Sequence, residues 1–213
     1  LIPNTLDDFP NIGNINSTVK YVDENLSGLF KPAFFLTPAI DDTNNNVIYI
    51  NKSDAFSKQD IYTTLAHEGI PGHMYQSAFF LQTNPLPVRH ILSYGGYTEG
   101  WATYVEFRPI PTNIPTKDWP KPNCSASYSL ALYSLCDIGI NYEGWSFKET
   151  KDFLKNYNIT GDDICKNIYQ TVINEPANYL QYYVGYLEIT ALRKVSKKQL
   201  GTDFNLKDFH KSF

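Results

Sequence analysis

Two hydrophobic runs near the start of the chain are separated by a strongly polar segment. Residues 33–36 (Ala-Phe-Phe-Leu) and 47–50 (Val-Ile-Tyr-Ile) are rich in aromatic and β-branched residues, which is typical of β-strands. Residues 41–46 are all Asp, Thr or Asn and favour a turn or loop. We therefore predict an antiparallel β-hairpin within residues 33–51, preceded by a helix over residues 17–29.

From Ser57 onward, capping signals and apolar stretches predict a mainly helical chain. Ser57 and Asp60 resemble a capping box, which opens a helix that runs into His67. Further helices are predicted over residues 97–107, 125–140, from 146 onward, 160–174 and 176–200. Five prolines within residues 109–122 predict a loop. The predicted fold class is mainly α with a small antiparallel β-hairpin.

Composition narrows the class of protein. Of the 213 residues, 42% are hydrophobic and 19% are charged, which is ordinary globular composition. A net charge of -4 without a basic run argues against binding to nucleic acid or to an anionic membrane surface. No apolar stretch reaches the roughly 18 residues of a spanning helix, so no transmembrane segment is predicted. The three cysteines form no CxxC, which argues against a cysteine-ligated metal or a disulfide framework.

The chain begins at Leu1 without a methionine, and we expect it to be the C-terminal catalytic portion of a longer protein. We divide it into a lead-in over residues 1–32, a β-hairpin over 33–56 and a helical part over 57–213 with the metal site. The N-terminal region of the same protein is expected to complete the cleft. An exported or cell-surface location is favoured, because an export signal would precede this start.

The segment from His67 to His73 reads His-Glu-Gly-Ile-Pro-Gly-His. In the common zinc-protease pattern, two histidines four residues apart lie on one helix face, with a glutamate beside the first as base. Six residues apart, the two imidazoles of a regular helix would lie about 120° from each other. Pro71 disrupts helical hydrogen bonding, and Gly69 and Gly72 allow unusual backbone angles. We predict a two-residue bulge within the helix that brings both histidines to one ion; the alternative is a turn between two helices.

Catalytic zinc sites commonly combine two histidines with a glutamate and keep a fourth position for water. Glu99 follows His73 by 26 residues and falls in the first turn of the predicted helix over residues 97–107. An acidic residue also favours a helix N-terminus without binding metal. Glu106, seven residues later, is a second candidate ligand or a residue that supports one, and His90 is a weaker candidate. The predicted site holds one zinc ion between His67, His73 and Glu99.

Residues 67–76 (HEGIPGHMYQ) and 97–104 (YTEGWATY) resemble the bacterial "domain of unknown function 885" family. The resemblance continues through residues 137–145, 176–193 and 204–210. That family is grouped with the gluzincin-type metallopeptidases, so the resemblance implies a zincin-like catalytic domain. The chain departs from the family at Met74 and Asn141, where the family often has histidine. If the second of those histidines aids the reaction, Asn141 can replace its hydrogen bond but cannot titrate.

The resemblance also implies roles for the predicted helix after Pro176. Tyr179, Tyr182, Tyr183 and Tyr186 share one helix face by their spacing, which is also the pattern of a packed aromatic stripe. In related gluzincin peptidases a tyrosine hydroxyl on such a helix faces the reacting carbonyl, and the resemblance assigns this role to Tyr182. Other candidates for substrate binding or support of the site are Glu106, Asn141, Tyr183, Tyr186, Arg193 and His210. For the last two, structural pairing is the favoured role.

The sequence thus predicts a zinc-dependent metallopeptidase that cleaves a peptide or small amide. Zinc lowers the pKa of a bound water towards about 7, Glu68 accepts its proton as general base, and Tyr182 stabilises the developing negative charge. Peptidases of this class hold an extended substrate against an exposed strand edge, here expected at residues 47–51. The alternatives are an inactive or truncated domain with a binding role, and a hydrolase of non-peptide amides or esters.

Overall fold

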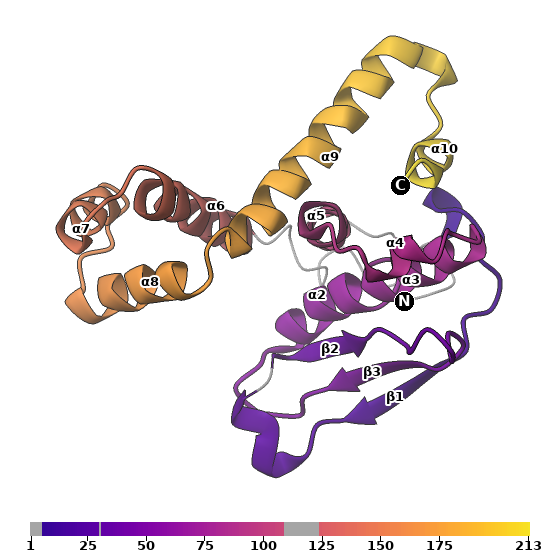
Figure 1. Ribbon diagram of the computed structural model, residues 1–213, viewed down its shortest axis with the longest axis horizontal. Helices are drawn as coiled ribbons and strands as arrows, with labels where there is room; N and C mark the ends of the chain where they lie inside the picture. The colour runs from indigo at the N-terminus through magenta and orange to yellow at the C-terminus, as the bar shows by residue number, and fades with distance from the viewer. Residues whose placement is uncertain (1–5, 30, 109–123) are drawn as a thin grey trace.

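The computed structural model describes residues 6–29, 31–108 and 124–213. It is mainly helical with one small sheet, which confirms the predicted composition of the fold (Figure 1). Helix α2 lies beside the sheet and α3 and α5 pack on α2, whereas α6, α7 and α8 form a group at the opposite end of the molecule. The long helix α9 runs between the two parts. The predicted proline-rich loop over residues 109–122 lies outside the described residues.

The sheet combines β1 (Ser17–Tyr21), β2 (Ala33–Leu36) and β3 (Asn46–Ile50) in the order β1-β3-β2. β2 pairs antiparallel with β3, which confirms the predicted hairpin, and β1 pairs parallel with β3. The predicted helix over residues 17–29 is wrong, because the chain forms β1 and then the short 3-10 helix η2 (Glu24–Leu29). All five residues of β1 are exposed, so no buried face marks this strand in the sequence. Its backbone pairing with β3 decides the conformation.

Four helices make up the part of the chain that contains the predicted metal ligands. They are α2 (Lys58–Glu68), α3 (His73–Gln82), α4 (Val88–Ile91) and α5 (Gly95–Glu106). The capping box of α2 is confirmed, since Ser57 Oγ accepts from the Asp60 N–H and the Asp60 carboxylate accepts from the Ser57 N–H. The helix predicted over residues 97–107 begins two residues earlier, at Gly95.

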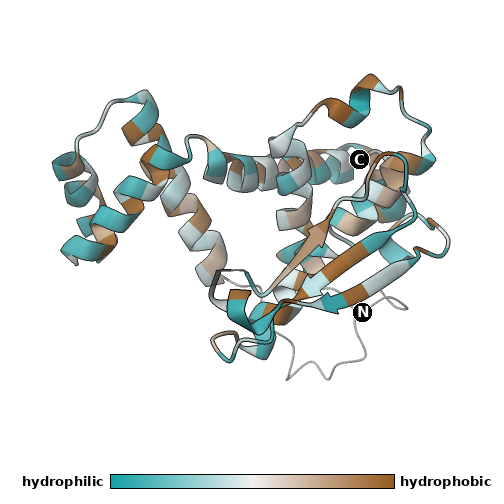
Figure 2. Cartoon of the chain, turned by 60° about the horizontal axis from the view of Figure 1, so that its bottom comes forward, coloured by the Kyte–Doolittle hydropathy of each residue, from teal (hydrophilic) through white to brown (hydrophobic). Residues whose placement is uncertain are grey.

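The C-terminal half contains α6 (Cys124–Asp137), the π-helix η4 (Ile138–Tyr142), α7 (Phe147–Lys155), α8 (Asp162–Asn174) and α9 (Asn178–Leu200). The short η5 (Gly201–Asp203) and α10 (Leu206–Lys211) then bring the C-terminus beside η1 (Leu6–Asp8). Hydrophilic and hydrophobic residues alternate around α7 and α8, as expected for helices that pack on one face (Figure 2). No helix in the described part of the chain is both long and apolar enough to span a membrane.

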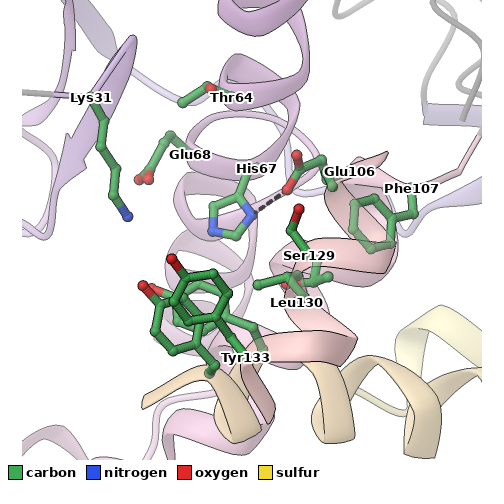
Figure 3. Close-up of a pocket in the computed structure, with 13 residues that line it drawn as sticks. Lys31, Thr64, His67, Glu68, Glu106, Phe107, Ser129, Leu130 and Tyr133 are labelled. Atoms are coloured by element: carbon green, nitrogen blue, oxygen red, sulfur yellow. Dashed lines mark hydrogen bonds and ion pairs between the residues drawn. The ribbon is translucent and has the colours of Figure 1, made fainter. Parts of the chain in front are cut away.

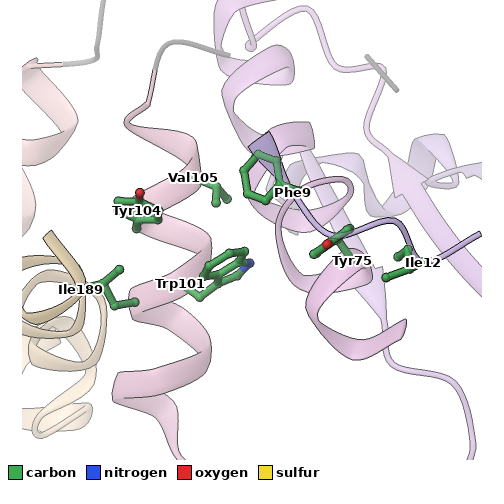
Figure 4. Packing of buried hydrophobic residues seen from close by; sticks show 7 residues of the cluster. All are labelled: Phe9, Ile12, Tyr75, Trp101, Tyr104, Val105 and Ile189. Carbon is green, nitrogen blue, oxygen red and sulfur yellow. The ribbon is translucent and has the colours of Figure 1, made fainter. Parts of the chain in front are cut away.

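Two separate hydrophobic cores stabilise these elements. The first lies among α3, α5, α9 and the N-terminal segment, and its central residues are Trp101 and Tyr104 (Figure 4). The second lies among α6, η4, α7 and α8 and includes the free cysteines Cys136 and Cys165. Because the cores are separate, the α6–α8 group meets the rest of the structure chiefly where α9 packs on α5 and α6.

α9 crosses α5 at a pair of glycines. A Cβ on Gly100 would lie 2.6 Å from the Cα of Gly185, and a Cβ on Gly185 would lie 2.8 Å from the Cα of Gly100. Carbon atoms in favourable contact are about 3.5–4.0 Å apart, so neither position has room for a side chain. The two glycines therefore allow α9 to place its tyrosines against the helix that carries Glu99.

Candidate metal centre

The His-Glu-Gly-Ile-Pro-Gly-His motif lies at a break between two helices. α2 ends at Glu68, the chain turns through residues 69–72 with a cis peptide bond before Pro71, and α3 begins at His73. The predicted bulge inside one continuous helix is therefore wrong, because the chain leaves the helix completely. The alternative, a turn between two helices, describes the backbone correctly.

The turn still brings both imidazoles together. The rings of His67 and His73 have centroids 4.8 Å apart and planes at 85°. The backbone doubles back tightly: a Cβ on Gly69 would lie 2.8 Å from the Leu65 carbonyl oxygen, and one on Gly72 would overlap the carbonyl oxygen of His67. Glycine at these positions allows a turn that a side chain would block.

Three potential metal ligands converge on one point. Nε2 of His67 lies 3.4 Å from Oε2 of Glu99, and Nε2 of His73 lies 3.3 Å from the same oxygen. Tetrahedral coordination with bonds of about 2.0–2.1 Å separates neighbouring ligand atoms by about 3.3–3.4 Å. One donor atom from each of the three residues lies within 4.8 Å of the other two. The structure thus brings the predicted ligand set together, and the two distances to Glu99 match the separation of ligand atoms in a tetrahedral zinc site.

The environment of Glu99 also fits a bound cation. Glu99 is the fifth residue of α5, not part of its first turn, so the alternative role at a helix N-terminus is not supported. Its Oε2 is buried and makes no well-formed hydrogen bond among the described residues, although the two Nε2 atoms lie 3.3 and 3.4 Å away, so a group bound between the three atoms would satisfy it. Burial raises the pKa of Glu99, but the two imidazoles outweigh burial and hold this pKa well below its usual range. The carboxylate is therefore charged and directed at the place where a cation would lie.

Glu106 supports His67 through the second nitrogen of the ring. Glu106 Oε2 lies 3.0 Å from His67 Nδ1 (Figure 3). A carboxylate at this position keeps the proton on Nδ1 and leaves Nε2 as the metal-binding nitrogen. Burial alone lowers the pKa of His67, but the hydrogen bonds with Glu106 and Glu99 outweigh it and raise the pKa of the metal-free ring to about 9, so a cation that binds Nε2 would displace a proton. Of the two roles predicted for Glu106, this contact supports the partner of a ligand.

Glu68, the predicted general base, lies at the end of α2 nearest to the sheet. Its Oε2 accepts a hydrogen bond of 3.1 Å from the backbone N–H of Phe35 in β2. The expectation that residues 47–51 form an exposed substrate edge is wrong, because β3 is paired on both sides. The strand edge that faces α2 belongs to β2. The hydrogen-bonding groups of β2 that point away from β3 therefore open towards Glu68.

Tyr182 is brought to the site as predicted from the resemblance. Its ring stacks on the His67 ring with centroids 6.1 Å apart, and its hydroxyl hydrogen-bonds to the Glu99 carboxylate. Burial, followed by the charge of Glu99, raises the pKa of Tyr182, so its hydroxyl stays protonated and can donate. A cavity of about 360 Å³ opens beside it, and much of its wall is apolar or aromatic, including Phe107, Leu130 and Tyr133.

The four tyrosines of α9 lie in two different environments. Tyr179 and Tyr182 line the cavity. Tyr183 and Tyr186 contact each other, and Tyr186 packs against Phe107 and the first hydrophobic core. For Tyr186 the packed aromatic stripe is thus the correct interpretation, and Tyr183 is not among the residues that line the cavity.

Asn141 lies in η4, away from the residues that line the cavity. Its Nδ2 donates to Asp137 Oδ1 at 2.9 Å and to the Val172 carbonyl at 3.2 Å. Asp137 Oδ2 in turn accepts from the N–H of Ala177, the residue before α9, at 2.8 Å. Asn141 does not contact the metal ligands; it stabilises the start of the helix that carries Tyr182.

His210 and Arg193 belong to a polar cluster where the two ends of the chain meet. Nδ1 of His210 donates to the Asp8 carbonyl at 2.6 Å, and its Nε2 accepts from the Tyr104 hydroxyl at 3.0 Å and from Arg108 at 3.1 Å. Arg193 also hydrogen-bonds to Tyr104. Burial lowers the pKa of His210 to about 4, so the ring is neutral near pH 7. Structural pairing is therefore the role of both residues.

Sequence reasoning missed three contributors to the site: Lys31 and Tyr133, which line the cavity, and the Phe35 N–H, which binds Glu68. Lys31 and Tyr133 lie far along the chain from the motif, and no local pattern marks them. Recognising that β2 is an edge strand would have pointed to Phe35. The weaker candidate His90 lies against Phe80 and is not part of the metal-ligand cluster.

The whole set of residues described above lies within one family match. The model of the family described as "Bacterial protein of unknown function (DUF885)" matches residues 3–213. The chain belongs to the DUF885 family. No curated protein matches its sequence.

Two solved structures are similar to this DUF885 chain. One is "the putative lipoprotein from Colwellia psychrerythraea", with a TM-score of 0.76 and 27% identity over 95% of this chain and 35% of that one. The other is "a putative lipoprotein of unknown function from Shewanella oneidensis", with a TM-score of 0.62 and 20% identity over 91% of this chain and 37% of that one. The second likeness shows the fold alone. The DUF885 chain thus spans little more than a third of the length of the two structures.

Proposed function

We propose that this chain is a zinc-dependent hydrolase of the metallopeptidase type. The observation that carries the proposal is the convergence of two Nε2 atoms on one buried Glu99 oxygen at 3.3 and 3.4 Å. His67, His73 and Glu99 would hold the ion, and Glu106 would orient His67. Glu68, which follows His67 directly, supplies a carboxylate next to that point. A buried carboxylate oxygen that faces two imidazole nitrogens without a well-formed hydrogen bond is suited to share a cation with them.

Each of the other residues has a defined task in hydrolysis. When bound, zinc supplies Lewis acidity that polarises a carbonyl and lowers the pKa of water to about 7. Glu68 accepts the proton of the attacking water and delivers it to the leaving amine. The Tyr182 hydroxyl, which is protonated and beside Glu99, donates a hydrogen bond to the oxyanion that develops on the substrate.

A peptide substrate is favoured by the surroundings of Glu68. The edge of β2 offers main-chain hydrogen bonds to an extended chain, and the apolar cavity beside Tyr182 can accept a side chain. The Phe35 N–H donates to Glu68 in the structure, and it could donate instead to an extended substrate that docks along β2. In a longer protein, a preceding region would complete the cleft, and an exported location is in keeping with the similarity to the putative lipoprotein from Colwellia psychrerythraea.

The test combines metal analysis with peptide cleavage. We expect elemental analysis to find about one zinc per chain. We also expect the protein to cleave members of a peptide library, as followed by mass spectrometry. A chelator should abolish this cleavage, and added zinc should restore it. Glu68→Gln should retain zinc and lose turnover, whereas Glu188→Gln, an exposed residue of α9, should keep both. Full activity of Glu68→Gln would refute the general-base role. Absence of stoichiometric zinc from the folded protein would refute the metal site itself.

A further inference from the structure

Lys31 is the only lysine or arginine among the described residues that line the cavity. It immediately precedes β2 and extends into the same space as Glu68 and His67, but from the other side (Figure 3). No ion pair is formed by Lys31 within the described part of the chain. Its ammonium group thus remains able to bind a charged group that enters the cavity.

The ammonium group is close to the proposed metal ligands. Lys31 Nζ lies 6.0 Å from the centre of the Tyr182 ring, and that ring lies 6.1 Å from the ring of His67. Lys31 Nζ is therefore no more than about 12 Å from the His67 imidazole, a distance that an extended peptide covers with about three residues. A short substrate segment can therefore place one of its charged groups at Lys31 and its scissile bond near Glu68 at the same time.

Lys31 is the cavity side chain best placed to bind an anion. Glu106 is bound to His67, and Glu68 accepts from the Phe35 N–H, so both carboxylates of the cavity already have partners. The metal would occupy His67, so the Lys31 ammonium group is the cation left for an incoming anion to pair with. Most of the wall between them is apolar or aromatic and offers an anion no charged partner. Charge-assisted hydrogen bonds to ammonium are about twice as strong as neutral ones, and Lys31 is the side chain that can supply them.

We propose that Lys31 is a specificity-determining residue that binds a carboxylate of the substrate, within about three residues of the cleaved bond. The inference rests on the proposed hydrolase function and narrows its substrate class to peptides with an anionic group near the scissile bond. Two sources supply that chemistry: the C-terminal carboxylate of a short peptide and the side chain of an internal Asp or Glu.

The experiment uses matched peptides that separate these sources. One pair has the same sequence with a free C-terminal carboxylate or a C-terminal amide. A second pair is amidated and has an internal Asp or Asn. We expect wild-type kcat/KM to be about tenfold higher for one carboxylate-bearing member, chiefly through a lower KM. Lys31→Met should remove that preference, Lys31→Arg should largely retain it, and Lys31→Glu should reverse it. Lys52→Met is the matched control, because Lys52 lies over Tyr21 and is not among the residues that line the cavity.

A binding measurement keeps this inference separate from the proposed function. Isothermal titration of the metal-free chain with the same peptides should show the carboxylate preference and its loss in Lys31→Met. If the preference in binding appears without any cleavage by the zinc-loaded protein, the hydrolase proposal fails and the role of Lys31 stands. If peptides are cleaved but the members of each pair are cleaved and bound equally, the role of Lys31 is overturned and the hydrolase stands. An equal fall in kcat/KM for all four peptides in Lys31→Met would also overturn the role of Lys31.

Discussion

The glycine crossing between α5 and α9 predicts how far the site depends on packing outside it. In Gly185→Ala, the new Cβ would meet the Gly96 carbonyl oxygen and lie 2.8 Å from the Cα of Gly100. Since contacting carbon atoms are about 3.5–4.0 Å apart, the two helices must separate by roughly 1 Å. Overpacking of this kind costs about 1–3 kcal/mol of folding stability. We expect urea denaturation to show a loss within that range.

The same substitution should affect activity more than metal binding. Tyr182 lies one turn before Gly185 on α9, so it moves away from His67 and Glu99 with the helix. A displacement of about 1 Å at a group that contacts the reacting atoms can lower the rate about 100-fold. The three metal ligands lie on α2, α3 and α5, so zinc stoichiometry should remain unchanged. Peptide hydrolysis measured beside elemental analysis separates the two effects.

Gly96→Ala provides the matched control for this substitution. Gly96 lies on α5 near the same crossing, but a Cβ at this position would have no atom within 4 Å. Alanine should therefore stabilise the helix by about 0.5–1 kcal/mol and leave peptide hydrolysis unchanged. If Gly185→Ala proves as stable and as active as Gly96→Ala, then the close approach of α9 to α5 is not required. Such a result would show that this packing does not position Tyr182.

Two further predictions concern the buried histidines. The pKa of His210 is lowered from 6.5 to about 4 by burial, so its neutral form stabilises the fold fully above pH 6.5 and that stabilisation is lost as the pH falls towards 4. The loss in the free energy of unfolding amounts to about 3 kcal/mol. Between pH 6.5 and 4, the free energy of urea unfolding should therefore fall by about 3 kcal/mol less in His210→Gln than in the wild type. Parallel plots of unfolding free energy against pH for the two proteins would contradict this prediction. Glu106→Gln removes the charge that supports His67 Nδ1, so the affinity for zinc should fall about 10- to 100-fold in competition titrations with a chromogenic chelator. An unchanged dissociation constant in the folded variant would exclude this role of Glu106.

Local chemistry was sufficient to predict many of the helices and to select His67, His73 and Glu99 as a group that the structure brings together. The capping boxes at Ser57 and Ser146 depend on contacts three residues apart, so the sequence itself reveals where α2 and α7 begin. The hairpin of β2 and β3 follows from two strand-forming runs around a polar turn. The residue types of the motif around His67 predict zinc-binding chemistry, because two histidines and a glutamate are an established catalytic zinc set.

Only the tertiary structure decided how these parts meet. Exposed β1 is a strand because β3 pairs with it, and the pairing order makes β2 the strand that faces Glu68. Whether His67 and His73 converge depends on a turn whose path is set by close backbone contacts. The positions of Lys31, Tyr182 and Asn141 depend on where whole helices and strands pack. Packing joins residues far apart in the chain, whereas local sequence patterns report only on neighbours.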